Sequence, residues 1–278
     1  MEQQATQETR LRQLVELFKA DSGSYRHLDT PRDAEGQRRL LRSLMNIRMP
    51  GPLDEAALCL QDEYLRARAR EKGVVTLGDI PTVAEAYQSK TPHADRLSLW
   101  QGDITRLAVD AIVNAANEEM LGCFVPMHSC IDNCIHTFAG VQLRNECARQ
   151  MARLRAEHGP GYTQPTAVPL LTEGFNLPAR NVIHIVGPIV EGRLTKALEK
   201  DLEACYTNTL DLCAERGLRS VAFCCVSTGV FRFPNRRAAQ IAVDATQSWL
   251  ARHEGRMDRI IFNVFKDEDK HHYETLLR

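Results

Sequence analysis

Residues 111–136 form the stretch AIVNAANEEMLGCFVPMHSCIDNCIH, and the organisation of the chain follows from it. The stretch begins with an apolar segment typical of a buried β-strand, which ends at two asparagines, Asn114 and Asn117. A segment with a glycine and a proline comes next, followed by a helical pattern of apolar residues. This order predicts a strand, a polar turn and a helix, with polar side chains gathered where the strand ends.

Three metal-ligating residue types lie inside this turn. Cys123, His128 and Cys130 have C-x4-H-x-C spacing, so they can converge on one point without help from the rest of the chain. Zinc prefers thiolate and imidazole ligands, and a site with three protein ligands keeps a fourth position for water or substrate. We therefore predict a Zn²⁺ site. Two alternatives remain: a closed structural site that also uses Cys134, and three buried side chains without a metal.

Composition limits the classes of function. The 278 residues carry 35 basic and 36 acidic side chains, a balance that argues against a nucleic-acid-binding protein. Nine cysteines without regular spacing indicate a reducing compartment and not a disulfide framework. The N-terminus is polar, and no run approaches the roughly 20 apolar residues of a membrane helix. We expect a cytoplasmic monomer with no membrane or nucleic-acid partner.

The apolar spacing divides the chain into three parts. Residues 1–75 are predicted to be helical, with helices over 5–20 and 53–71 and a third helix between them that Thr30 caps. Residues 76–95 have mixed patterning and form a join. Residues 96–278 alternate between strand and helix patterns. Strands are expected at 96–101, 111–114, 167–171, 182–186, 221–226 and 260–264, and helices at 130–156, 194–216, 235–253 and 267–277.

Strands rich in valine and isoleucine, interleaved with helices, predict an α/β fold with a largely parallel or mixed sheet covered on both faces. Ligands bind such sheets in the crevice at the carboxyl ends of the strands. Three polar turns follow predicted strands at this edge: residues 102–104, 114–117 and 227–231.

Together these turns resemble a macrodomain, the α/β module that binds ADP-ribose. The matching segments are LWQGDIT (99–105), VDAIVNAAN (109–117), TEGFNLPARNVIHIVGP (172–188) and VAFCCVSTGVFRFP (221–234). The resemblance covers the chain from about Leu97 to its C-terminus and implies a three-layer α/β/α domain with a central mixed sheet.

The segment GCFVPMHSCIDNCIH (122–136) resembles one branch of this family, the zinc-dependent macrodomains. Members of that branch are microbial protein-ADP-ribose hydrolases with a helical N-terminal extension, often encoded beside a sirtuin-type ADP-ribosyltransferase and lipoylation proteins. The resemblance implies that Cys123, His128 and Cys130 bind zinc near the distal ribose. It also implies a mono-ADP-ribosylated protein, such as a lipoyl-carrier-type protein, as the substrate.

Two polar residues at strand ends are candidate ligand contacts. Asp103 and Ile104 fall where macrodomains bind adenine, although a Gly-Asp pair by itself is more typical of a turn with a helix cap. Asn117 offers a donor and an acceptor to ribose hydroxyls, and it too is a common turn residue. We assign Asn117 to the distal ribose and Asn114 to holding the loop.

The remaining candidates flank the predicted metal. Ile131 is expected to form a wall of the pocket, and Asp132 to accept the proton of a water or to orient the ribose, although an acidic residue in a first helical turn often only complements the helix dipole. The segment Ser227, Thr228, Gly229, Val230 and Phe231 offers successive backbone N–H groups to a pyrophosphate, and Phe231 would cover the ligand.

Two classes of function fit these residues. The first is a zinc-dependent hydrolase that removes mono-ADP-ribose from protein side chains, with Asp132 and Asn117 at the reacting centre. The second is a binding module that holds ADP-ribose without turnover and uses zinc only for structure. A zinc-stabilised nucleic-acid binder is disfavoured by the balanced charge. Release of free ADP-ribose from a modified protein would separate the first two.

Overall fold

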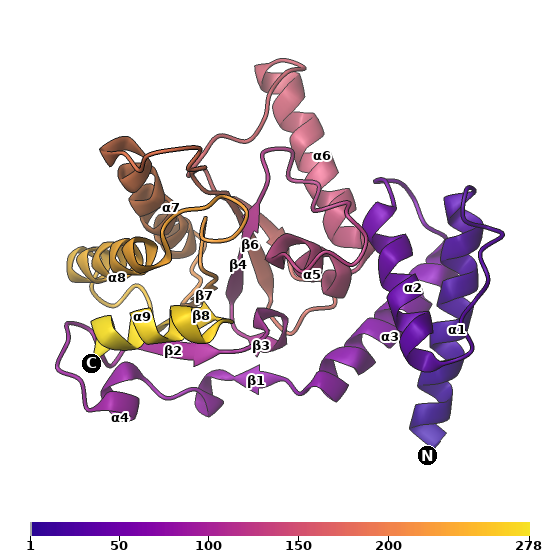
Figure 1. The fold of residues 1–278 in the computed structure, drawn as a ribbon, viewed down its shortest axis with the longest axis horizontal. Helices are drawn as coiled ribbons and strands as arrows, with labels where there is room; N and C mark the ends of the chain where they lie inside the picture. The colour runs from indigo at the N-terminus through magenta and orange to yellow at the C-terminus, as the bar shows by residue number, and fades with distance from the viewer. Residues whose placement is uncertain (1) are drawn as a thin grey trace.

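The protein forms three layers, with a mixed β-sheet between two layers of helices (Figure 1). The structure is a computed structural model that describes the backbone of residues 2–278 and the side chains of residues 7–278. The helical N-terminal part lies beside the sheet domain, against one of its helical layers (Figure 1). No helix in the described part of the chain combines the length and the apolar composition that crossing a bilayer requires.

The central sheet has six strands, of which five are parallel and one, at an edge, is antiparallel. This agrees with the predicted mixed sheet. In spatial order the strands are β2 (Leu97–Gln101), β8 (Arg259–Val264), β7 (Ser220–Phe223), β4 (Ala111–Ala116), β6 (Asn181–Val186) and β5 (Leu170–Glu173).

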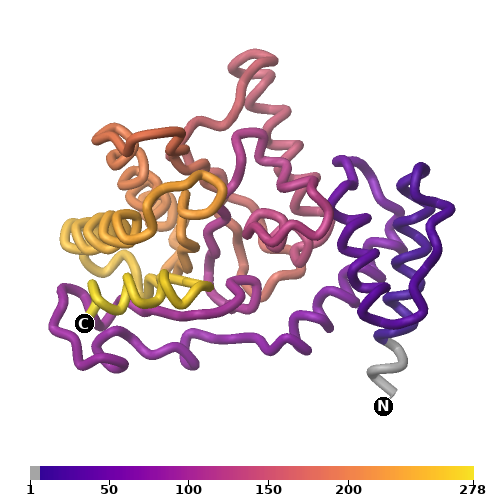
Figure 2. Tube along the Cα trace, in the orientation of Figure 1, coloured from indigo at the N-terminus to yellow at the C-terminus, as the bar shows by residue number. Residues whose placement is uncertain are grey.

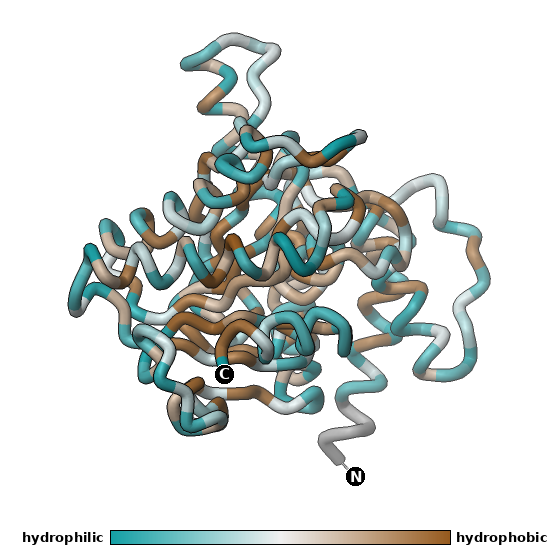
Figure 3. The backbone as a smooth tube through the Cα atoms, turned by 60° about the vertical axis from the view of Figure 1, so that its left-hand side comes forward, coloured by the Kyte–Doolittle hydropathy of each residue, from teal (hydrophilic) through white to brown (hydrophobic). Residues whose placement is uncertain are grey.

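The strands are nearly continuous runs of buried residues, which is why apolar patterning located them. Ile112 and Val113 of β4 and Ile183 of β6 have no exposed surface. Figure 3 shows hydrophobic colour concentrated in the centre of the molecule and hydrophilic colour on the outer helices and loops. Burial on both faces is the expected state of parallel strands covered by helices.

Five helices cover the sheet. The helices α7, α8 and α9 lie together on one face, where α8 contacts both α7 and α9, and α5 and α6 lie on the other face (Figure 1). They are α5 (Ile131–Ala139), α6 (Val141–His158), α7 (Lys196–Glu215), α8 (Asn235–Arg252) and α9 (Asp267–Leu277).

The long helix predicted over 130–156 is wrong as a single element, because α5 ends and α6 begins on either side of Gly140. Gly140 has φ +94°, a left-handed conformation that breaks the helical hydrogen-bond ladder and strongly favours glycine. A Cβ atom there would also lie 2.8 Å from Nε2 of Gln61. The chain therefore turns sharply, which aims α5 at the end of β4.

Three further expectations need correction. Thr30 does not cap the second helix, because Asp33 is the N-cap and its Oδ1 accepts a hydrogen bond from the Gly36 N–H at 2.7 Å. The strand predicted over 221–226 ends at Phe223, where the chain leaves the sheet for a loop. The strand predicted over 167–171 instead spans Leu170–Glu173, with the left-handed residue Ala167 outside it.

The N-terminal helices, α1 (Glu2–Ser22), α2 (Ala34–Ile47) and α3 (Glu55–Lys72), pack into a bundle (Figure 2). Leu14, Phe18 and Leu44 form part of its own apolar core, and Val141 of α6 joins that core from the sheet domain. The bundle is thereby packed against the helical layer that holds α5 and α6.

The join between the bundle and the sheet is short and structured. It contains β1 (Val75–Thr76), η1 (Leu77–Asp79) and α4 (Val83–Tyr87). β1 pairs in parallel with β3 (Leu107–Ala108), which follows η2 (Ile104–Arg106). This pairing places the end of α3 beside the turn at the end of β2.

Candidate active site

The site lies at the carboxyl ends of β4 and β7, which are neighbours in the sheet. After β4 the chain continues to β5 and β6 on one side of the sheet, and after β7 it continues to β8 on the other side. The order of the strands therefore reverses between β4 and β7. The loops after β4 and β7 therefore diverge and leave a crevice, as in other open α/β sheets. We call residues 121–130 after β4 the cysteine loop, and residues 227–231 after β7 the 227–231 loop.

The structure brings the three predicted metal ligands together. Their ligand atoms all lie within 4.8 Å of one another, and Sγ of Cys123 is 3.6 Å from Nδ1 of His128. All three side chains are half-buried, so they are close to the surface of the crevice. Two sulfurs and one imidazole form a donor set that suits zinc.

Cys130 is both a candidate ligand and the N-cap of α5, where its Sγ accepts a hydrogen bond from the Asn133 N–H at 3.4 Å. Burial, with added contributions from Cys123 and Asp132, raises the pKa of the Cys130 thiol to about 12. Metal binding requires the thiolate, so a bound cation must displace this proton. The side chains present therefore fit a zinc ion, whose positive charge would lower the thiol pKa that burial raises.

Cys134 lies apart from this cluster, which bears on the closed four-ligand alternative. Its Sγ receives a long contact, 3.5 Å, from Nη2 of Arg42 and is not among the clustered ligand atoms. Among the described residues, the cluster therefore contains three ligand atoms, and the Cys134 sulfur is not one of them.

The cysteine loop is fastened from outside by two side chains whose roles sequence analysis missed. Asn133 donates from Nδ2 to the carbonyls of Cys123 (3.3 Å) and Val125 (3.0 Å). Arg42 of α2 donates from Nη2 to the His128 carbonyl and to Oδ1 of Asn133, both at 2.8 Å. The N-terminal helices thus hold the backbone that carries the predicted ligands.

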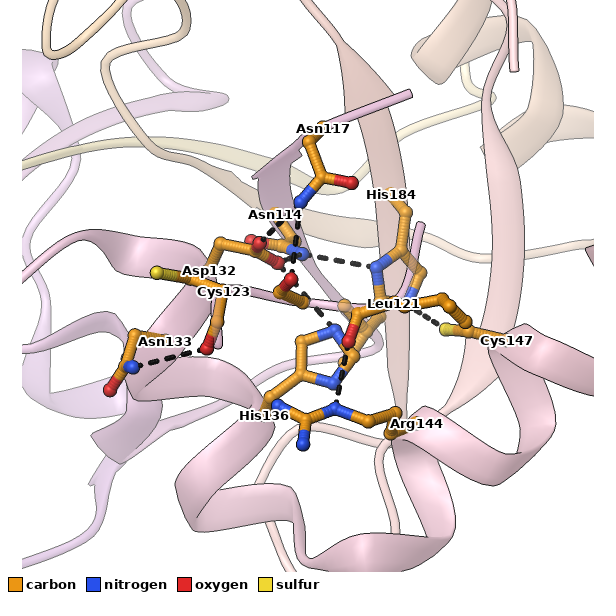
Figure 4. Close-up of polar contacts among 12 residues, drawn as sticks. Asn114, Asn117, Leu121, Cys123, Asp132, Asn133, His136, Arg144, Cys147 and His184 are labelled. Carbon is orange, nitrogen blue, oxygen red and sulfur yellow. Dashed lines mark hydrogen bonds and ion pairs between the residues drawn. The ribbon is translucent and has the colours of Figure 1, made fainter. Parts of the chain in front are cut away.

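Asp132 lies at the start of α5, under the end of β4. Figure 4 shows its carboxylate beside the side chains of Asn114 and Asn117. Nδ2 of Asn114 donates to Oδ1 of Asp132 at 2.8 Å, and Nδ2 of Asn117 is 3.4 Å from Oδ2 and 3.2 Å from the Gly122 carbonyl. Burial raises the pKa of Asp132 to about 6, although the hydrogen bond from Asn114 opposes this shift.

Behind Asp132 lies a buried network centred on His184 of β6. Nδ2 of Asn114 also donates to Nδ1 of His184 at 3.1 Å, so the network assigns the proton to Nε2, which is 3.1 Å from Oγ1 of Thr172. Burial lowers the pKa of His184 to about 3, and the imidazole is therefore neutral. A histidine within the apolar strand VIHIV was the available sequence signal for this residue.

His136, Cys147 and His184 also place ligand atoms within 4.8 Å of one another, in a fully buried cluster. Both nitrogens of His184 are already engaged with Asn114 and Thr172, so we interpret this cluster as a support for Asp132 and not as a metal site. Nε2 of His136 is 3.5 Å from Oδ1 of Asp132.

The predicted adenine contacts lie at the end of β2. Oδ1 of Asp103 accepts from the Thr105 N–H (3.0 Å) and hydroxyl (2.6 Å), which makes it the cap of η2. Lys72 of α3 forms an ion pair with Oδ2 at 2.5 Å, a contact that sequence analysis missed. Burial acts to raise the pKa of Asp103, but Lys72 and Thr105 outweigh it and the pKa is lowered. Ile104 is buried.

The 227–231 loop borders the crevice opposite the cysteine loop. Ser227 is left-handed (φ +66°), and its carbonyl accepts from the Phe233 N–H at 3.0 Å. Among the described residues, the N–H groups of Gly229, Val230 and Phe231 have no hydrogen-bond acceptor. Successive free amides in a turn suit an anionic ligand. Ile131, at the start of α5, is half-buried against the core.

Comparison with known proteins places this geometry in a family. The family model described as Macro domain matches residues 113–242, which include most of β4, the cysteine loop and the 227–231 loop. A protein-ADP-ribose hydrolase of Treponema medium is 44% identical over 272 residues, covering 98% of this chain and 99% of that protein. The chain belongs to the macrodomain family.

Two further known proteins are similar to this chain over most of its length. A protein-ADP-ribose hydrolase of Staphylococcus aureus strain MRSA252 is 38% identical over 99% of this chain and 97% of its own. A Trypanosoma brucei macrodomain, solved in complex with ADP-ribose, superposes with a TM-score of 0.64 at 30% identity, covering 85% of this chain and 95% of its own. The three-layer macrodomain fold expected from the sequence is confirmed.

A further relative is a longer protein. A probable bifunctional ADP-ribose hydrolase/ADP-ribosyltransferase of Fusarium oxysporum f. sp. cubense is 38% identical over 251 residues. This match covers 86% of the present macrodomain chain but 40% of the fungal protein.

Proposed function

We propose that this macrodomain is a zinc-dependent protein-ADP-ribose hydrolase that releases mono-ADP-ribose from modified protein side chains. The proposal rests on one observation. Two cysteines and a histidine cluster at the ligand-binding edge of a macrodomain sheet, and one of them, Cys130, is two residues before Asp132 in the sequence. The names of the relatives from Treponema medium and Staphylococcus aureus support the same activity.

ADP-ribose would be held along the crevice. The free amides of Gly229, Val230 and Phe231 bind the pyrophosphate, and Asp103 with Ile104 contacts the adenine. Binding energy from these groups, which lie away from the scissile bond, can be used to hold the distal ribose in a reactive geometry. Oδ1 of the half-buried Asn117 amide accepts from the Glu119 N–H at 3.0 Å and has a second lone pair, with which it would accept a hydrogen bond from a ribose hydroxyl.

Asp132 is the polar group we assign to the reacting centre. Its Oδ1 is engaged with Asn114, whereas Oδ2 has only a long contact, 3.4 Å, with the amide of Asn117 among the described residues. A carboxylate oxygen has two lone pairs, so Oδ2 can accept a hydrogen bond or a proton from the attacking water or a ribose hydroxyl. Ile131 forms the apolar wall beside it.

Cys123, His128 and Cys130 are the residues that would hold the zinc ion. When bound there, zinc supplies a Lewis acid that polarises a water or a ribose hydroxyl near the anomeric carbon. The remaining chemistry belongs to the chain, which binds the diphosphate, excludes water from the buried side of Asp132 and orients its carboxylate.

The biological setting is also part of the proposal. We place this protein in the sirtuin-linked macrodomain branch, acting as a cytoplasmic monomer on a lipoyl-carrier-type protein. The name of the Fusarium oxysporum relative, which joins a hydrolase to an ADP-ribosyltransferase, supports a functional link between the two activities.

The test is to incubate the zinc-loaded protein with a mono-ADP-ribosylated protein and measure free ADP-ribose. We expect release by the wild type and a loss of about 100-fold or more in Asp132→Asn, since general acid–base groups contribute about 10²–10⁴-fold. Binding of free ADP-ribose by Asp132→Asn, measured by calorimetry, should persist. Binding without any release by the wild type would instead indicate an ADP-ribose-binding module with a structural zinc.

A further inference from the structure

The N-terminal helices and α5 enclose a hollow of about 190 Å³ that is separate from the crevice. Four arginines line it, and we call it the arginine hollow. They come from α2 and α3, and the lining contains one acidic residue, Glu35. The arginines are Arg38, Arg39, Arg42 and Arg68.

Two of these arginines are not neutralised by neighbouring acids. Arg38 pairs with Glu35 at 3.3 Å, and Arg68 pairs with Glu71 outside the hollow. Arg42 donates from Nε and Nη2 to neutral acceptors, and its Nη1 has no hydrogen-bond partner among the described residues. The guanidinium of Arg39 likewise contacts no acid among them.

The floor of the hollow is apolar and includes Tyr64, Leu65 and Phe138. Guanidinium groups beside such a floor favour a carboxylate carried on a hydrocarbon stem, because the apolar residues can pack against the stem while the guanidinium groups bind the carboxylate. A free inorganic anion would not use the apolar part of this surface. The chemistry of the lining therefore fits acidic side chains of a polypeptide.

The arginine hollow adjoins the catalytic edge of the molecule. Met127 of the cysteine loop lines it, and Arg42 in its wall also holds the His128 carbonyl at 2.8 Å. On another side, the ring of Phe138 lines the hollow, and its centroid is 3.6 Å from Nζ of Lys72, which forms the ion pair with Asp103. A protein attached to the distal ribose must leave the crevice near the cysteine loop, next to this hollow.

We propose that the arginine hollow binds an acidic segment of the ADP-ribosylated protein and so selects the protein part of the substrate. This inference rests on the hydrolase function proposed above and adds a substrate-binding surface contributed by the N-terminal helices. The crevice holds the nucleotide, and the hollow holds the polypeptide that carries it.

The test uses the full chain loaded with zinc and the double variant Arg38→Glu/Arg39→Glu. With a mono-ADP-ribosylated acidic protein, kcat/KM should fall about 10-fold or more, mainly through KM, because charge reversal at an interface weakens encounter and binding. With a short ADP-ribosylated peptide that lacks acidic neighbours, kcat/KM should change less than about twofold. Arg66→Glu/Arg70→Glu is the matched double control, since both arginines are on α3, are exposed and do not line the hollow.

The outcomes separate this inference from the function on which it rests. If the wild type releases ADP-ribose from both substrates and the double variant matches it on the protein, the arginine hollow does not bind the substrate. If the wild type releases none, the hydrolase function fails instead. A polyglutamate peptide should inhibit turnover of the protein substrate, and equal inhibition by the same concentration of inorganic phosphate would overturn the assignment to a polypeptide.

Discussion

Replacing Arg42 with methionine should weaken binding of zinc at the proposed site, although Arg42 is not one of the predicted ligands. Nη2 of Arg42 donates to the His128 carbonyl and to Oδ1 of Asn133 at 2.8 Å, and Asn133 in turn holds the carbonyls of Cys123 and Val125. The Arg42→Met variant keeps the aliphatic stem but removes the charged donor. The segment between the predicted ligands then loses its attachment to α2.

The expected size of this effect follows from the hydrogen bonds that Arg42 supplies. Groups that orient metal ligands through hydrogen bonds typically change metal affinity by about 10–100-fold. That range corresponds to about 1.4–2.7 kcal/mol of binding free energy. Because Arg42 binds both the loop backbone and Asn133, we expect the zinc dissociation constant to rise by at least about tenfold.

The assay is competition for zinc between the protein and a chromophoric chelator at fixed pH. Arg39→Met is the matched control, since it removes an arginine from the same helix that contacts neither the cysteine loop nor Asn133. Thermal unfolding of both metal-free variants checks that each is folded. Equal zinc affinities in Arg42→Met, Arg39→Met and the wild type would refute the view that the N-terminal helices stabilise the metal site.

Two further predictions concern the support of the site and the 227–231 loop. His184 is neutral when folded, with its pKa lowered to about 3, whereas in the unfolded chain it binds a proton below about 6.5. Its own contribution to the unfolding free energy should therefore decrease by roughly 2–3 kcal/mol between pH 6 and 4, while Asp132, with its pKa raised to about 6, acts in the opposite direction. Urea unfolding should show that the unfolding free energy of the wild type falls relative to that of His184→Gln over this range, and a difference between the two proteins that does not change with pH would contradict this. A Cβ at Gly187 would lie 2.1 Å from Oγ of Ser227, so Gly187→Ala should displace the 227–231 loop and weaken ADP-ribose binding about 5- to 100-fold by calorimetry. Gly192→Ala, where nothing lies within 4 Å, should bind as the wild type does, and unchanged affinity in Gly187→Ala would contradict this prediction.

The parts of the molecule that were predictable are those encoded within a few consecutive residues. The strand at Ala111–Ala116 follows from its apolar run, and the grouping of Cys123, His128 and Cys130 follows from spacing within one turn. The largely parallel or mixed character of the sheet was accessible because strands and helices alternate along the second part of the chain.

The parts that were missed depend on contacts between distant segments. Arg42 and His128 are separated by 86 residues, and Lys72 lies 31 positions before Asp103, so no local pattern marks either pair. Gly140 resembles one more position in a helix because flanking apolar residues keep the helical period. Its left-handed φ becomes necessary only when α5 and α6 pack against Gln61 of the N-terminal helices.

The proposed mechanism is tested most directly by measuring metal content and hydrolysis on the same protein sample. We predict one zinc ion per chain in the wild type, loss of ADP-ribose release after chelation, and recovery on adding zinc back. Cys130→Ala should contain less zinc and release no ADP-ribose, yet still bind the free nucleotide. Hydrolysis that proceeds at the original rate after the metal has been removed would contradict the central claim.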